Sequence, residues 1–470
     1  MSMKSIGLFW LVLMMMILYT LQGFIQGFAT SIPLFLASYK ASWKEQGTFS
    51  WVSYPFSCKI LWAPIIDSIY SRRLGGRHQT WLVPIQITVG LILLVLSFYL
   101  EYLLMNLRVV FLAIIFFVIF FLIATQDIVV DGWTLVLFAS SNPQWSSTCQ
   151  TAGEMIGRFF GSTVLMTFES ANFTNKYIRE TFSLPHRSYG LFTLEQYTFF
   201  WGVAFILVSL IIGIVFFVSK LQSKNTEEEQ IEKLNLWQTY LDIFYLLKKR
   251  CVQQFALILL TFNLGFAATY YMTNLTLVGY GVTRDTIALM NIPLLIIHII
   301  VPLCLSQTRS PLKWFAWAYI PRLFASILLA IYIFFTPQLL FKPHFYPLLL
   351  MFICLNEGLC YLLKASRIGV YARVSEPRIG GTYMTLLATI SNLGQSLSST
   401  IVLYVAEWLP KQHAYSIEVV ACFILGFIWI GLMWRMIIRL DALPVEEWHL
   451  KPKLQPQLST ATTISQINIA

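Results

Sequence analysis

The chain carries little charge for its length. Only 11% of its 470 residues are Asp, Glu, Lys or Arg, whereas 57% are hydrophobic and the mean hydropathy is +0.69. Soluble domains carry roughly 25% charged residues, and the polar stretches here, the linker-sized run 220–234 and the tail from Asp441 to Ala470, are too short to hold a globular core. The composition therefore excludes a soluble catalytic domain and predicts an all-α polytopic membrane protein.

Catalytic and metal-binding patterns are missing as well. The six histidines form no HxxxH pair, no Ser-His-Asp arrangement and no metal-ligand spacing, and the seven cysteines form no CxxC pair. The cysteines fall in or beside apolar segments, where they are typical of small packing residues. The sequence therefore predicts a protein that is not an enzyme, needs no metal or other cofactor, and has no disulfide framework.

The formal charge of +10 comes from basic residues in short loops between apolar segments. This placement argues against nucleic acid as a partner and makes the lipid bilayer the expected environment. With the N-terminus inside, the cytoplasmic loops would hold about twice as many Lys and Arg residues as the opposite loops. The positive-inside rule therefore places both termini and the central linker in the cytoplasm.

Apolar stretches of spanning length recur six times before and six times after a charged linker. This arrangement is typical of the major facilitator fold, in which two bundles rock around a site near the middle of the membrane. We therefore expect twelve transmembrane helices in two six-helix bundles, at 1–219 and 251–440, joined by a cytoplasmic linker at 220–250 and followed by a cytoplasmic tail at 441–470. The expected spans are about 6–28, 48–66, 80–100, 109–138, 146–168, 197–219, 252–278, 286–305, 314–336, 345–366, 381–405 and 415–437.

The loop after the second span resembles a motif of the same superfamily, an Asp followed by a basic, glycine-containing cluster. Here Asp67 is followed by Arg72, Arg73 and Arg77, with two glycines between the arginines. We expect these charges to lock the cytoplasmic side of the molecule.

Two carboxylates, Asp127 and Asp131, lie one helical turn apart inside the fourth expected span. Each would cost roughly 2.5–3.5 kcal/mol at the centre of a membrane helix. Counting from Arg108 places Asp127 about 28 Å along the helix, in the cytoplasmic third. The pair is therefore interpreted as a coupling or gating site; the alternative is a hydrated cap at the cytoplasmic edge.

Several basic residues also lie within or near the ends of expected spans. Lys59, in the second span, is expected to face the phosphates of an anionic substrate. In the fifth span, Arg158 follows Glu154 by four residues, so an ion pair along the helix and a substrate contact are both possible. For Arg322, Lys364 and Arg367 the alternatives are function and snorkelling to the interface. The basic candidates within the spans are therefore Lys59, Arg158, Arg322, Lys364 and Arg367.

Four long stretches resemble the acetyl-coenzyme A transporter family of the endoplasmic reticulum membrane. They are TQDIVVDGW, STCQTAGEMIG, FESANFTNKYIR and EPRIGGTYMTLLATISNLG. The earlier segments PFSCKILWAPIID, which contains Lys59 and Asp67, and WLVPIQ are similar too, and the resemblance extends from about Tyr19 to about Arg439. It implies a major facilitator fold and import of cytosolic acetyl-CoA into the lumen. The superfamily relation further suggests proton coupling, and exchange is the other possible mode.

The resemblance carries over Lys59, Asp67, Asp127, Asp131 and the segment 380–383 as family positions. It therefore implies a substrate-binding role for Thr382 and Tyr383 beside Lys59, whereas Arg158 is a candidate on its own charge alone. Two alternatives stay open from the residues: the same fold could carry another anionic solute, or the protein could be a membrane-embedded acetyltransferase that uses acetyl-CoA.

Overall fold

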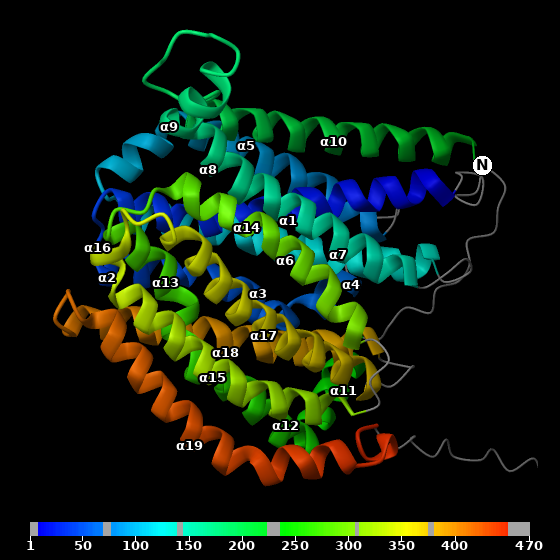
Figure 1. The fold of residues 1–470 in the computed structure, drawn as a ribbon. Coiled ribbons are helices and arrows are strands. Elements are labelled where there is room, and N and C mark those ends of the chain that lie inside the picture. The colour runs from blue at the N-terminus through cyan, green and yellow to red at the C-terminus, as the bar shows by residue number, and fades with distance from the viewer. Residues whose placement is uncertain are drawn as a thin grey trace, which may run out of the picture.

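The computed structural model describes residues 8–68, 77–138, 144–222, 236–305, 310–374 and 380–449, and these ranges contain helices and no strand (Figure 1). The helices of the first half are α1 (Leu8–Ser38), α2 (Trp43–Phe49), α3 (Tyr54–Cys58), α4 (Ala63–Ser68), α5 (Arg77–Met105), α6 (Val109–Phe138), α7 (Gln144–Arg158), α8 (Leu165–Glu169), α9 (Ala171–Thr174) and α10 (Leu194–Gln222). Those that follow are α11 (Leu236–Lys248), α12 (Arg250–Thr261), α13 (Ala267–Gly279), α14 (Arg284–Leu305), α15 (Pro311–Phe334), α16 (Thr336–Leu339), α17 (Phe345–Val374), α18 (Gly380–Trp408) and α19 (Ala414–Ala442).

Short turns of other helix types interrupt or extend these helices. The 3₁₀ turns are η2 (Ser50–Ser53), η3 (Lys59–Leu61), η7 (Phe262–Phe266) and η8 (Val445–Glu447), and the π-helical turns are η5 (Phe159–Val164) and η6 (Asn175–Arg179). Because η2 and η3 connect α2, α3 and α4, these pieces form one broken span. In the same way η5 joins α7 to α8, and η7 joins α12 to α13.

The described residues contain the twelve expected spans. Nine of them are helices long and apolar enough to cross a membrane, namely α1, α5, α6, α10, α12 with α13, α15, α17, α18 and α19. The broken span α2–α4, the pair α7–α8 and α14 complete the twelve among the described ranges. The prediction of an all-α polytopic membrane protein with the major facilitator arrangement is therefore confirmed.

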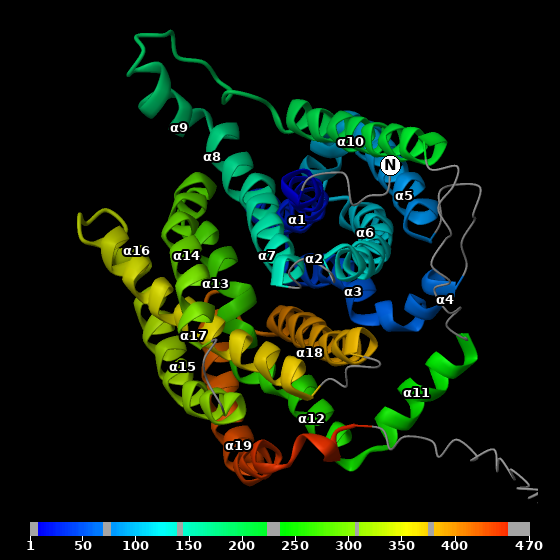
Figure 2. The ribbon, with the colours of Figure 1, turned by 90° about the vertical axis from the view of Figure 1, so that its right-hand side faces the viewer.

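The spans form two bundles that lie side by side. Figure 2 looks along many of the helices and shows α1, α5, α6, α7 and α10 together, and α12, α14, α15, α17, α18 and α19 together. We call the end where α1 begins and α19 ends the terminal end, and the opposite end, where α1 leads into α2, the loop end (Figure 1). The domain boundaries at 219, 250 and 440 stay predictions.

The closest helix contact in the first bundle joins α1 to α7 through glycines. Gly153, Gly157 and Gly161 of α7 and η5 face α1, and Gly23 and Gly27 of α1 face α7. A Cβ atom on Gly153 would lie 2.6 Å from the Cβ of Tyr19, and one on Gly27 would lie 2.5 Å from the carbonyl oxygen of Arg158. The backbones touch here because neither helix carries a side chain at the crossing.

Hydroxyl groups join the two bundles between the broken second span and α18. The contacts are Ser57–Ser396 (2.9 Å), Ser53–Ser396 (2.9 Å), Ser50–Thr400 (2.9 Å) and Thr48–Tyr404 (3.1 Å). Nearest the loop end, the backbone N–H of Lys44 donates to the Glu407 carboxylate at 3.0 Å. At that end an ion pair also joins Glu169 of α8 to Arg284 of α14 at 3.5 Å. Polar contacts therefore connect the two bundles at the loop end.

We expect Gly157→Val to lower the melting temperature of the purified protein by several degrees. Its new side chain would push against the backbone of Thr20 and Phe24, and overpacking costs about 1–3 kcal/mol or more. Gly213→Val, in α10, is the matched control, since a Cβ there meets nothing within 4 Å. Equal melting temperatures for the two variants, measured by scanning fluorimetry in detergent, would contradict this packing.

Candidate functional site

Local breaks in the helices position the charged side chains. Lys59 is the first residue of η3, where the second span changes from α-helix to a 3₁₀ turn. Prolines at the starts of α3 and α4, Pro55 and Pro64, keep this span from continuing as one regular helix. Arg158 is the last residue of α7, directly before the π-helical turn η5. Such interruptions within spans commonly mark functional positions.

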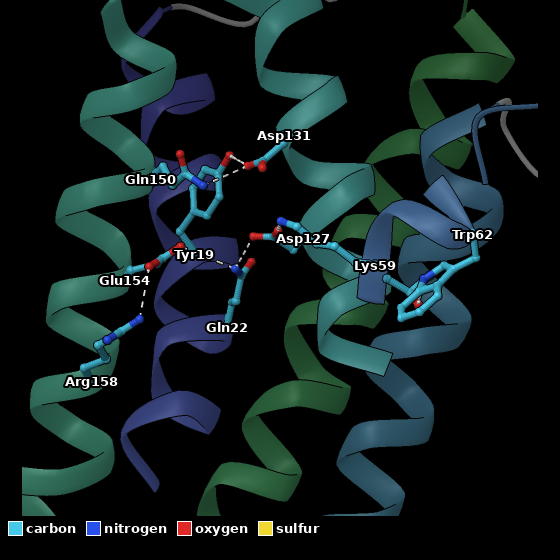
Figure 3. Close-up of polar contacts among 10 residues, drawn as sticks. Tyr19, Gln22, Lys59, Trp62, Asp127, Asp131, Gln150, Glu154 and Arg158 are labelled. Carbon is cyan, nitrogen blue, oxygen red and sulfur yellow. Dashed lines mark hydrogen bonds and ion pairs between the residues drawn. The ribbon is translucent and has the colours of Figure 1, made fainter. Parts of the chain in front are cut away.

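Lys59 and Asp127 form a buried ion pair between the second span and α6 (Figure 3). The two residues are 8% and 3% exposed. The side-chain amide of Gln22, on α1, also donates to Asp127. Because its carboxylate is paired in the protein interior, Asp127 is not a hydrated cap at the edge of the helix. The charge of Lys59 is likewise already balanced within the first bundle.

Asp131 has a different environment, one turn along α6. Its carboxylate accepts a hydrogen bond from the Tyr19 hydroxyl at 2.7 Å and one from the Gln150 amide at 3.2 Å (Figure 3). Among the described residues its hydrogen-bond partners are thus neutral. The i, i+4 spacing places both carboxylates on one face, but only Asp127 has a cation beside it.

Glu154 and Arg158 extend this polar network along α7. Their ion pair measures 3.6 Å, and Arg158 also donates to the side-chain oxygen of Gln26. The amide of Gln22 reaches Glu154 at 3.4 Å as well as Asp127, so it connects the two acidic groups (Figure 3). The Arg158 side chain nevertheless remains 46% exposed. Of the two expectations for Arg158, the ion pair is therefore present, and the side chain stays accessible to a ligand.

Arg158 faces charged residues of the second bundle. Lys364, on α17, is exposed and lies within electrostatic range of both Arg158 and Glu154. Nearby, the His298 ring of α14 stacks on the Tyr361 ring of α17 with the centroids 3.4 Å apart. Arg158 and Lys364 are therefore both accessible and lie close enough for each to feel the other's charge.

Arg322 and Arg367 lie inside the second bundle. The Arg322 guanidinium lies 4.1 Å from the centre of the Phe266 ring, and Arg322 is only 2% exposed. Arg367 lies over Phe262 at 4.2 Å and donates to the Ser391 hydroxyl at 2.5 Å. Neither cation snorkels to the membrane surface. The sequence alone left the choice between function and snorkelling open, because it does not show that η7 places an aromatic ring against each arginine.

The other predicted site residues are placed separately. Tyr383 is fully buried in the core of the second bundle, and its hydroxyl donates to the backbone oxygen of Trp448 at 3.4 Å. Thr382 is half-buried beside it, near the start of α18. Asp67 belongs to α4, and Arg77 is the first residue of α5. Arg72 and Arg73 lie outside the described residues, so the predicted lock stays a prediction.

A cavity of about 630 Å³ lies at the loop end, away from this network. It is lined by residues of both bundles, including Tyr39, Glu169 and Arg284. The Glu169–Arg284 ion pair thus lies at the wall of this cavity. The network of charged residues and the loop-end cavity are therefore two separate features.

Solved transporters share this fold. A bacterial homolog of the human lysosomal transporter Spinster, in an inward-facing and unoccupied conformation, matches with a TM-score of 0.62, covering 94% of this chain and 98% of that chain at 13% identity. The xylose transporter XylE from E. coli, in an inward-open conformation, matches with a TM-score of 0.55, covering 91% and 95% at 12% identity. At such low identity these likenesses concern the fold alone.

Two curated yeast proteins are related along most of the chain. An uncharacterized protein of Schizosaccharomyces pombe is 28% identical and is aligned over 94% of this chain and 89% of its own length. An uncharacterized membrane protein of Saccharomyces cerevisiae is 26% identical, over 93% of this chain and 96% of its own length.

The family described as acetyl-coenzyme A transporter 1 matches residues 10–224 and 298–418, which is most of the sequence. These matched ranges include Lys59, Asp127, Asp131 and Arg158. The protein is thus a membrane transporter rather than an enzyme. The chain belongs to the acetyl-coenzyme A transporter family.

Proposed function

We propose that this transporter carries acetyl-CoA from the cytosol into the lumen of the endoplasmic reticulum. The observation that carries the proposal is the pair of accessible cations, Arg158 and Lys364, which face each other between the bundles of a protein from this family. Acetyl-CoA is an anion with several phosphate charges, and basic side chains between two bundles suit such a substrate. The excess of basic residues in the loops on one side supports cytoplasmic termini.

Arg158 is the better candidate for a phosphate contact than Lys59. Lys59 was expected to face the phosphates, but its ammonium group already pairs with Asp127 in the protein interior. A phosphate could reach it only by displacing that carboxylate. We therefore assign Arg158 to the substrate and the Lys59–Asp127 pair to coupling between helices. Thr382 and Tyr383 are left out, since Tyr383 lies in a hydrophobic core.

Asp131 is our candidate for the proton site. It holds α6 to α1 through Tyr19 and to α7 through Gln150. Protonation would weaken both hydrogen bonds, because a neutral carboxyl group is a poorer acceptor than a carboxylate. The contacts of α6 with α1 and α7 would then change with each proton bound. Such a change in helix contacts would couple movement of the bundle to the passage of a proton. The alternative mode of transport is exchange without a proton.

Transport of the intact molecule is tested in proteoliposomes with acetyl-CoA labelled separately in its acetyl and CoA parts. We expect both labels to enter together and in equal amounts. Entry of the acetyl label while the CoA label stays outside would instead establish a membrane-embedded acetyltransferase. Uptake of another labelled anionic solute, without uptake of acetyl-CoA, would favour a different substrate for the same fold.

The Lys59–Asp127 pair predicts a pattern that two single variants and their double variant would reveal. Lys59→Met and Asp127→Asn should each lower stability, because breaking a buried ion pair costs about 3–5 kcal/mol. Each should also reduce acetyl-CoA uptake. The double variant should recover the melting temperature but not the uptake. A Lys59→Met protein with unchanged stability and unchanged concentration dependence of uptake would remove the pair from the mechanism.

Asp131→Asn should abolish the dependence of uptake on an imposed pH gradient. Asn cannot take up and release a proton, yet it can still accept a hydrogen bond from Tyr19. Exchange of internal for external acetyl-CoA at equal pH should therefore persist within about twofold, which is under 0.5 kcal/mol. Glu195→Gln, an exposed carboxylate at the start of α10, is the control. If the Asp131→Asn protein still responds to the gradient, the proton binds elsewhere.

A further inference from the structure

Arg322 is a buried cation that finds no polar partner among the described residues. It lies in the middle of α15, directly after Pro321, and is 2% exposed. Its Nε atom is buried and unbonded, and the described residues give the side chain no hydrogen bond and no ion pair. The contact it does make is with the face of the Phe266 ring, at 4.1 Å. A guanidinium carries five N–H donors, so most of its bonding capacity is unused.

Such a group is expensive to bury unless something pairs with it. A charge removed from water without a partner destabilises a protein strongly, and a cation–π contact compensates only part of that cost. Lys59 of the first bundle, in a similarly apolar setting, has Asp127 beside it. Glu357 of α17 lies within electrostatic range of Arg322 but does not form an ion pair with it. The second bundle therefore holds a cation that is ready to receive an anion.

The surroundings of Arg322 are net positive. Lys364 and Arg367, both on α17, add two positive charges, and Glu357 contributes a single negative one. A further polar group lies near these charges: the Asn263 amide nitrogen of η7 is buried and unbonded, and Tyr271 lies close to Asn263 and within electrostatic range of Arg322. The uncharged groups facing Arg322 from α13 and α17 include Tyr271 and Cys360. Three cations, one carboxylate and an unused amide donor make a site for an anion with several oxygen atoms.

The location of these groups connects them to the proposed substrate path. Lys364 lies within electrostatic range of Arg158, across the space between the bundles. Arg322, in turn, is coupled through Glu357 to Lys364. A ligand bound to Arg158 in the first bundle could thus extend along Lys364 to Arg322 in the second. Such a ligand would need more than one anionic group, spaced along its length.

We propose that Arg322 is the centre of a phosphate-binding site in the second bundle, which accepts one phosphate group of the substrate while Arg158 contacts another. The ligand class is an organic molecule with two or more phosphate groups, and the inference rests on the proposed function for its identification as acetyl-CoA. The guanidinium offers two parallel N–H donors to the phosphate oxygens, Arg367 and Lys364 add charge, and Asn263 supplies a neutral donor. The phosphate, in turn, gives Arg322 the polar partner that the described part of the chain does not supply.

The test combines stability with binding in three purified variants, Arg322→Met, Arg322→Lys and Arg108→Met. The probes are inorganic pyrophosphate and adenosine 3′,5′-bisphosphate, with binding measured as the ligand-induced rise in melting temperature. Arg322→Met should melt higher than the wild type without ligand, since it removes an unpaired buried charge. It should also bind both probes at least tenfold more weakly. Arg322→Lys keeps the charge but loses the fork of donors, so we expect at least tenfold weaker binding there too.

Arg108, exposed at the loop end between α5 and α6, is the matched control, and its variant should bind the probes like the wild type. If Arg322→Met melts lower than the wild type while Arg322→Lys binds the probes normally, Arg322 is a packing residue and the proposal fails. Normal acetyl-CoA uptake by Arg322→Met, with an unchanged KM, would also overturn the site and leave the proposed function standing. Conversely, Arg322-dependent binding of pyrophosphate without any acetyl-CoA uptake would keep the site and refute the proposed substrate.

Discussion

The ion pair between Lys59 and Asp127 is the interaction on which the first bundle depends. A charge inside a membrane protein must be paired, hydrated or neutralised, because the surrounding lipid offers it no hydrogen bonds. The pair satisfies this requirement by joining the broken second span to α6. Gln22 adds a contact from α1 and connects the pair to Glu154 of α7. Four spans of one bundle thus meet around two opposite charges.

Irregular helix turns make this arrangement possible. A continuous α-helix repeats its side-chain directions every few residues, whereas a 3₁₀ or π-helical turn shifts the residues that follow it to a different face. Lys59 begins a 3₁₀ turn, and Arg158 precedes a π-helical one. In the second bundle, η7 brings the rings of Phe262 and Phe266 beneath two arginines. The carbonyl groups freed by such turns are bonded in part by tyrosines, as when Tyr319 donates to the oxygen of Phe262 at 3.0 Å.

The same turns explain what could be predicted from the sequence. Span number and order follow from apolar length, which is a local property, so the twelve spans were found. The two carboxylates of α6 could be identified as candidate site residues because each is a charged group within an apolar segment. Their different partners could not be predicted, since Tyr19 and Gln22 lie in an almost entirely apolar helix. They become partners only because α1 packs against α6. The phosphate role expected for Lys59 likewise could not account for a partner that is 68 residues away.

The two bundles treat their buried charges in different ways. In the first, Lys59 is paired with a carboxylate of the protein, so its charge needs no ligand to balance it. In the second, Arg322 is buried against an aromatic ring, and the structure gives it no anion among the described residues. A substrate that supplies the anion would stabilise the second bundle and, through Lys364 and Arg158, attract the first toward it. The charge of the substrate would then favour the conformation in which the two bundles enclose it. Binding would therefore shift the protein toward this closed conformation, instead of filling a site that is already formed.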